Sequence, residues 1–245
     1  MEWEIRKIEY SMAKNTKGLS FFDHLNELRI RVIKSFLSFL ICSLIFYNFI
    51  NFFLFLLVKP VGHLIFTSPS EAFTARMNLT FLGGFFLSLP LILYQIWMFV
   101  ALGLTPEEKK YIKIFGPLSL ILFLLGSLFA YFVMIPFSLR FLLSFSSALF
   151  VPMITVDEYI SFVGSFIFSF GIVFELPLIL FFLAKIGIAS PEFLRQKRKH
   201  AVVLILIVSA VLTPPDVLSQ ILMALPLIVL YEAGIVVTQL TYKTR

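Results

Sequence analysis

Long apolar runs separated by short polar segments make up most of the chain. A helix needs about 20 consecutive apolar residues to cross a hydrocarbon core of about 30 Å. Four runs reach that length, so the pattern predicts an all-α polytopic membrane protein. The expected bounds of these four spans are 35–58, 77–104, 112–139 and 159–185.

Two further apolar runs near the end of the chain are shorter, at 201–212 and 217–231. At 1.5 Å per residue, about 12–15 residues reach only ~18–22 Å. With their flanks they form candidate helices at 199–213 and 216–236. They are either re-entrant or spanning with local thinning of the bilayer, and length does not decide between these.

The polar segments complete the domain plan. Residues 1–19 are charged and weakly patterned, and they lack the apolar core of a cleavable signal peptide. From Ser20 to Lys34 apolar residues recur at helical spacing, which predicts a helix along the membrane surface. We therefore expect a polar segment at 1–19, a single membrane domain at 20–242 and a short tail at 243–245.

Composition supports membrane insertion. Hydrophobic residues make up 60% of the 245 residues and charged residues only 14%, whereas soluble domains are about 25% charged. The single cysteine, Cys42, lies inside an apolar run and cannot form an intrachain disulfide. The net charge of +6 could attract nucleic acid, but its distribution along the chain argues against a nucleic-acid partner.

The basic residues indicate the orientation. All but three of the 20 lysines and arginines fall in the N-terminal region, after the second run, after the fourth run or in the tail, and the exceptions are Lys59, Arg76 and Arg140. Because loops rich in Lys and Arg stay in the cytoplasm, both termini are predicted to be cytoplasmic.

Glu175 is an acid inside the fourth apolar run, two residues before Pro177. An ionisable group at such depth costs roughly 2.5–3.5 kcal/mol on insertion scales, and it is tolerated when it faces a bundle interior or a wet cavity. Glu175 is therefore either the lining of a polar cavity or a protonated side chain hydrogen-bonded to a neighbouring helix.

Other acids lie at the predicted cytoplasmic surface. Glu27 stands among basic side chains, where it is either a receptor for a cationic ligand or part of local ion pairs. Glu108 follows Thr105 and Pro106 as the third residue of a capping box, yet it could also pair with an arginine-rich peptide. Asp216 repeats the capping pattern after Thr213.

The sequence contains no recognisable catalytic motif. No nucleotide-binding loop, zinc-protease motif or serine-hydrolase motif occurs, and the histidines, His24, His63 and His200, are scattered. We expect neither enzymatic activity nor a cofactor nor a metal site.

Several motifs in order resemble the TatC family, the core subunit of the twin-arginine protein translocase, over roughly residues 20–242. They are His24-Leu25-Asn26-Glu27-Leu28-Arg29 with Arg31, Tyr94-Gln95-Ile96-Trp97-Met98-Phe99, Gly103-Leu104 with Glu107-Glu108-Lys109-Lys110, Phe129-Ala130-Tyr131-Phe132, Phe174-Glu175-Leu176-Pro177, Ser190-Pro191-Glu192 and Leu212-Thr213-Pro214-Pro215-Asp216. Leu102 departs from the pattern, which has proline before Gly-Leu.

The resemblance implies six spans in a curved, glove-like bundle with two short final helices, in the inner membrane of a bacterium. It implies that the protein binds signal peptides with two consecutive arginines and nucleates a translocation complex driven by the proton-motive force. The implied partners are these signal peptides, TatA- and TatB-type single-span proteins at the last two helices, further copies of the chain and the bilayer.

The resemblance also assigns residues. By position it places Glu27 and Glu108 in the signal-peptide site, and the supporting residues are His24, Arg29, Arg31 and Phe99. Glu175 matches the family's intramembrane acid, Pro60 matches a functionally sensitive proline, and Asp216 belongs to the last motif.

The rival hypothesis is a small-solute secondary transporter that uses Glu175 as its coupling acid. Such transporters are built from inverted repeats. The motif Leu-Pro-Leu-Ile-Leu recurs at 89–93 and 176–180, with a variant at 225–229, but its unequal spacing argues against repeats.

Overall fold

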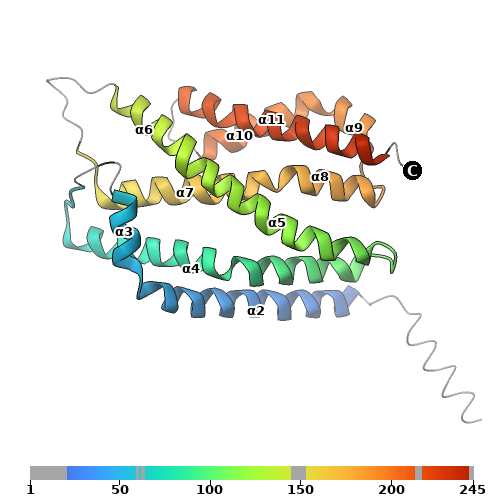
Figure 1. Ribbon diagram of the computed structural model, residues 1–245, viewed down its shortest axis with the longest axis horizontal. Helices are drawn as coiled ribbons and strands as arrows, with labels where there is room; N and C mark the ends of the chain where they lie inside the picture. Colours follow the sequence, from blue (N-terminus) through green and yellow to red (C-terminus); the bar gives the residue numbers. More distant parts are fainter. Residues whose placement is uncertain (1–20, 59–60, 62–63, 145–152, 213–216, 243–245) are drawn as a thin grey trace, which may run out of the picture.

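The computed structural model describes residues 21–58, 61, 64–144, 153–212 and 217–242, and Figure 1 shows long helices lying side by side along one axis. In that part of the chain, strand-like pairing is limited to an isolated parallel bridge between Ile65 and Thr155. The prediction of an all-α bundle is therefore confirmed.

The first helix differs from the prediction. Helix α2 (Phe21–Tyr47) runs without interruption through the segment that was expected to form a separate surface helix, and the residues apolar enough to cross a membrane begin at His24. It ends where Asn48 donates side-chain hydrogen bonds to the carbonyls of Leu44 and Ile45. The remainder of the predicted first span forms a second helix, α3 (Ile50–Val58). The prediction of a separate surface helix was thus wrong, because an amphipathic helical segment continues readily into an apolar one.

Helix α4 (Pro69–Val100) runs antiparallel to α2 and ends in a 3-10 turn, η1 (Ala101–Gly103). The two helices approach closely because small residues lie between them. A Cβ atom at Gly84 would overlap the backbone of Ser43, so glycine is required for this contact.

The third pass crosses the bundle diagonally in Figure 1. It consists of α5 (Lys109–Phe129), a π-helical turn η2 (Ala130–Met134) and α6 (Ile135–Leu143). The π turn ends two residues before Pro136, which lacks the N–H that a regular α-helix would use.

The fourth pass is divided at Glu175 into α7 (Val156–Phe174) and α8 (Leu176–Lys185). Pro177 lies at the second position of α8, where a missing N–H costs least. The expected single span at 159–185 therefore consists of two helices, and the acid lies at the break between them.

The last part of the chain comprises α9 (Pro191–Gln196), α10 (Arg198–Leu212) and α11 (Val217–Tyr242). Helix α11 packs on α8, and α9 and α10 pack on α11. The Tyr231 hydroxyl of α11 donates to the carbonyl of Leu194 in α9 at 2.9 Å. This buried hydrogen bond joins α11 to α9, the short helix in the basic segment that follows α8.

Five helical segments of the described residues are long and apolar enough to span a membrane: 24–47, 69–103, 109–143, 156–185 and 220–239. Helix α10, with 15 residues, is shorter than each of these five segments. Nevertheless α10 and α11 run in opposite directions, so α2 begins and α11 ends at the same end of the bundle, on the right in Figure 1. The six-span count remains a prediction that this arrangement favours.

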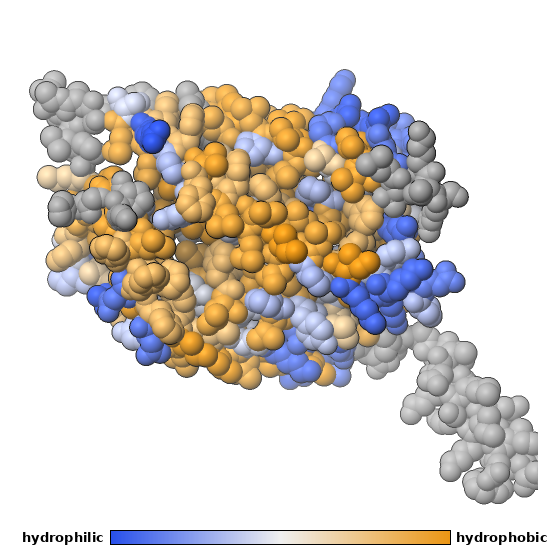
Figure 2. Space-filling model, viewed as in Figure 1, coloured by the Kyte–Doolittle hydropathy of each residue, from blue (hydrophilic) through white to orange (hydrophobic). Residues whose placement is uncertain are grey.

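The surface has the character expected of a membrane protein. Figure 2 shows apolar residues over most of the visible face and strongly hydrophilic residues gathered at the right-hand end. Large apolar side chains point outward, including Leu44 at 74% and Val211 at 79% exposure. Soluble monomers rarely expose such continuous apolar surface.

Candidate functional site

A cluster of polar and aromatic side chains lies where the beginning of α2 meets the end of α4. The Glu27 carboxylate pairs with the Arg31 guanidinium at 2.6 Å, one helical turn away. Arg31 Nη1 donates to Gln95 Oε1 of α4 at 3.2 Å. The rings of His24 and Phe99 pack with their centroids 4.6 Å apart. We call these five residues the rim cluster.

The antiparallel packing of α2 on α4 explains the rim cluster, because it places the first turns of one helix against the last turns of the other. Four of the predicted site residues, His24, Glu27, Arg31 and Phe99, are thereby brought together. Arg29 is exposed on α2, and among the described residues no hydrogen bond or ion pair joins it to the cluster.

The rim cluster has spare acceptor capacity. The side chain of Arg31 is only 14% exposed, whereas that of Glu27 is 35% exposed. Arg31 contacts Glu27 through one carboxylate oxygen, and a carboxylate offers about four acceptor positions. Glu27 can therefore receive a second cation from the solvent side while it holds Arg31.

Glu108 lies at the same end of the bundle, in the turn between η1 and α5. Its Oε2 accepts a hydrogen bond from the backbone N–H of Thr105 at 3.0 Å. This contact is one half of the predicted capping box, but α5 itself begins only at Lys109, with Glu108 at its N-cap position and no side-chain cap hydrogen bond. The carboxylate is half-buried and retains acceptor positions beyond the one that Thr105 uses.

Glu175 is buried between two helices, and the Ser119 hydroxyl of α5 donates to its carboxylate at 2.9 Å. Of the two interpretations from the sequence, the hydrogen bond to a neighbouring helix is the one observed, although here the carboxylate accepts. The break between α7 and α8 turns this side chain toward α5 rather than into the hollow described next.

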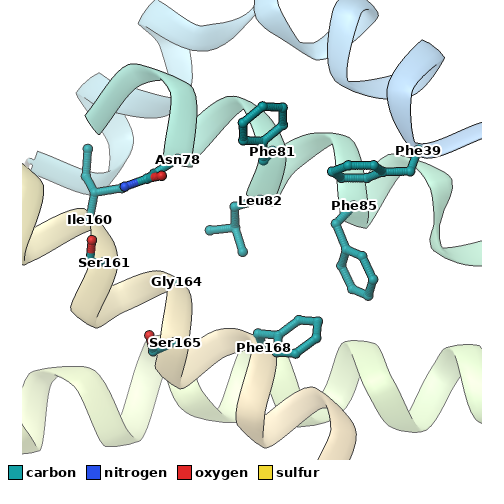
Figure 3. Close-up of a pocket in the computed structure, with 10 residues that line it drawn as sticks. All are labelled: Phe39, Asn78, Phe81, Leu82, Phe85, Ile160, Ser161, Gly164, Ser165 and Phe168. Atoms are coloured by element: carbon teal, nitrogen blue, oxygen red, sulfur yellow. The ribbon is translucent and has the colours of Figure 1, made fainter. Parts of the chain in front are cut away.

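A hollow of about 410 Å³ opens between α2, α4 and α7 (Figure 3). Aromatic side chains surround it, and Asn78, Ser161 and Ser165 supply polar atoms on one side. Gly164 leaves room in its wall because it carries no side chain. The hollow is thus a mostly apolar concavity inside the bundle.

Sequence reasoning missed the partners of the predicted acids. Gln95 stood inside a recognised motif, and its amide in an apolar run was a signal that it contacts another polar group. Ser119 carried a weaker signal of the same kind. Two predicted residues, Pro60 and Asp216, lie outside the described part of the chain.

Comparisons with known proteins agree with one another. The family model "Sec-independent protein translocase protein (TatC)" matches residues 23–226. A Sec-independent protein translocase protein TatC from Carboxydothermus hydrogenoformans is 43% identical over 228 residues, which cover 91% of this chain and 94% of the relative. The corresponding protein of Aquifex aeolicus is 39% identical over 234 residues, covering 91% and 96%.

A solved structure, described as the crystal structure of the twin arginine translocase receptor TatC, superposes with a TM-score of 0.82 at 40% identity. The match covers 91% of this chain and all of that one. The bundle and the order of its helices are therefore shared with that receptor.

Proposed function

The chain belongs to the TatC family and is a multi-pass, non-enzymatic subunit of the Sec-independent protein translocase, and from this premise we propose that its rim cluster binds the paired arginines of a signal peptide. The observation that carries the proposal is Glu27, an acid with spare acceptor positions that is held at the charged end of the bundle by Arg31. Glu108 supplies a second carboxylate at that end.

The chemistry suits guanidinium groups. Hydrogen bonds between a guanidinium and a carboxylate are charge-assisted and contribute roughly 1.5–3 kcal/mol each. Two acids can thus receive two arginines, and the ring of Phe99 offers an apolar face beside them. Lysine would bind less well, because its ammonium lacks the planar fork that matches a carboxylate.

The apolar segment that follows the arginines would lie along α4 toward the hollow. Residues 81, 85, 88, 92, 95 and 99 of α4 follow one another at three- and four-residue spacing, so the rim cluster and the hollow of Figure 3 share one stripe of that helix. Gln95 and Phe85 are ten residues apart, about 15 Å along the axis. A short apolar helix would reach the hollow from the rim.

The orientation and partners belong to the same proposal. Both termini lie in the cytoplasm of a bacterium and the chain crosses the inner membrane six times, which the basic residues and the common end of α2 and α11 support. TatA- and TatB-type proteins dock at α10 and α11, and further copies of the chain join the complex. Glu175 then acts after signal binding, in transport driven by the proton-motive force.

Site-specific photocrosslinking tests the proposal. A photoreactive residue in place of Glu27, Glu108 or Phe99 should crosslink an Arg-Arg signal peptide, whereas one at exposed Lys199 on α10 should not. Peptides with both arginines replaced by glutamine should lose the crosslink. Equal crosslinking by the neutral peptide would contradict a site built on carboxylates.

A small-solute transporter is the weaker hypothesis. The family relatives and the solved receptor both favour protein translocation. Solute flux through vesicles that contain only this chain would be required to revive it.

A further inference from the structure

A second concavity lies between α4 and α5, near the charged end of the bundle but outside the rim cluster. It is a groove of about 540 Å³, and its walls include Pro90, Tyr94 and Trp97 of α4. From α5 it is lined by Lys113, Gly116 and Pro117. The walls of the groove are mostly apolar, Lys113 is the one charged residue among those that line it, and we call it the α4–α5 groove.

The sequence keeps this groove open. Each helix carries a proline on the groove wall, and proline disturbs the regular packing of a helix surface because it removes a hydrogen bond. Gly116 leaves the floor empty: a Cβ atom there would lie 3.9 Å from Trp97 Cδ1, an ordinary contact distance. The space is therefore wide enough for a chain of methylene groups.

The cation stands at the charged end of the groove. Lys113 is exposed, and the structure shows no acid within ion-pair distance of it among the described residues. Lys109 precedes it by four residues and so lies on the same face of α5, at the first turn. Two amines thus flank the end of the groove that faces the polar edge of the membrane.

We propose that the α4–α5 groove binds an anionic phospholipid, with one acyl chain along the groove and the phosphate against Lys113. Basic pockets between transmembrane helices at the cytoplasmic side are typical sites for acidic lipid headgroups. The exposed hydroxyl of Tyr94 can donate to an ester or phosphate oxygen.

Charge distinguishes this occupant from the signal peptide. A leader with two arginines finds no carboxylate among the residues that line the groove and meets the Lys113 amine, whereas the phosphate of a lipid is attracted by that amine. The apolar length of the groove suits a hydrocarbon chain, which a free phosphate ion does not have. The rim cluster and the α4–α5 groove therefore select ligands of opposite charge.

The test is lipid binding to the purified full-length protein in a neutral detergent, measured by native mass spectrometry. Phosphatidylglycerol should bind more tightly than phosphatidylcholine. Lys113→Gln should weaken phosphatidylglycerol binding about fivefold, which is the effect of roughly one basic residue near a membrane surface, and leave phosphatidylcholine unchanged. Lys199→Gln removes an exposed amine on α10 and should have no effect.

A second pair of variants tests the groove itself. Gly116→Leu should fill it and weaken both lipids, whereas Gly116→Ala should be tolerated because the added methyl group has room. Circular dichroism melting shows whether each variant folds, and the lysine variants test the proposal independently.

Three results would overturn the proposal. The first is equal binding of the two lipids. The second is equal loss with Lys113→Gln and Lys199→Gln, which would indicate diffuse attraction to the charged end. The third is full displacement of the lipid by glycerol phosphate, which carries the headgroup chemistry without an acyl chain.

Discussion

Replacing Glu27 by glutamine is the sharpest test of the rim cluster, because it removes one negative charge and keeps the shape of the side chain. Glu27 already pairs with Arg31 at 2.6 Å across one helical turn. An ion pair of this spacing on a helix surface contributes only about 0.3–0.5 kcal/mol. A guanidinium from a signal peptide can therefore share Glu27 with Arg31 at small cost.

The size of the effect follows from these contributions. A charge-assisted hydrogen bond to the leader contributes roughly 1.5–3 kcal/mol, and loosening Arg31 costs about 0.5 kcal/mol. The net loss in Glu27→Gln is then about 1–2.5 kcal/mol, which corresponds to roughly 5- to 60-fold weaker binding. The rest of the peptide keeps its contacts, so binding should weaken without disappearing.

The assay is fluorescence anisotropy of a labelled Arg-Arg signal peptide titrated with purified protein at constant salt. Glu232→Gln is the matched control, since Glu232 also pairs with an arginine at 2.6 Å. Its partner, Arg198, is the first residue of α10, and that helix begins at the same end of the bundle as α2. The side chain of Glu232 is 42% exposed, close to the 35% of Glu27. The control should bind the peptide as the unmodified protein does.

Two outcomes would refute this reasoning. Equal weakening in Glu27→Gln and Glu232→Gln would mean that net charge, and not a site, attracts the peptide. Unchanged binding in Glu27→Gln would remove this acid from the peptide site.

Three further predictions follow from other contacts. Glu108→Gln should reduce crosslinking to the twin arginines while the fold and its melting temperature persist, because the glutamine oxygen can still accept from the Thr105 N–H. Unchanged crosslinking would remove this acid from the site. Glu175→Ala should retain peptide binding and impair export of a folded reporter, and normal export would contradict a role for the buried acid in transport. Gly126→Ala should lower the free energy of unfolding by about 1–3 kcal/mol in denaturant, since the methyl group would overlap the carbonyl of Phe170. Gly164→Ala should be neutral, because its methyl group would lie 3.5 Å from the nearest neighbour. Equal effects of the two would show that packing at α5 and α7 is looser than described.

The sequence by itself determined which segments are helical and membrane-embedded. Lipid cannot satisfy unpaired backbone groups, so an apolar run that is long enough to cross the membrane has little alternative to a helix. The second to fourth predicted spans therefore coincide broadly with α4, α5–α6 and α7–α8. The break after α2 was missed because Asn48 is only one of several polar residues in the predicted first span. Its side chain ends the helix by bonding to carbonyls that only a formed helix presents.

Tertiary structure alone decided the partners of the acids. Glu27, Arg31 and their spacing were visible in the sequence, but the contact with Gln95 depends on which face of α4 turns toward α2. Glu175 likewise finds Ser119 only because the helix breaks at that point and α5 crosses beside it. Periodicity along one helix does not specify its rotation against another, since that rotation is set by small residues and packing between segments far apart in the chain.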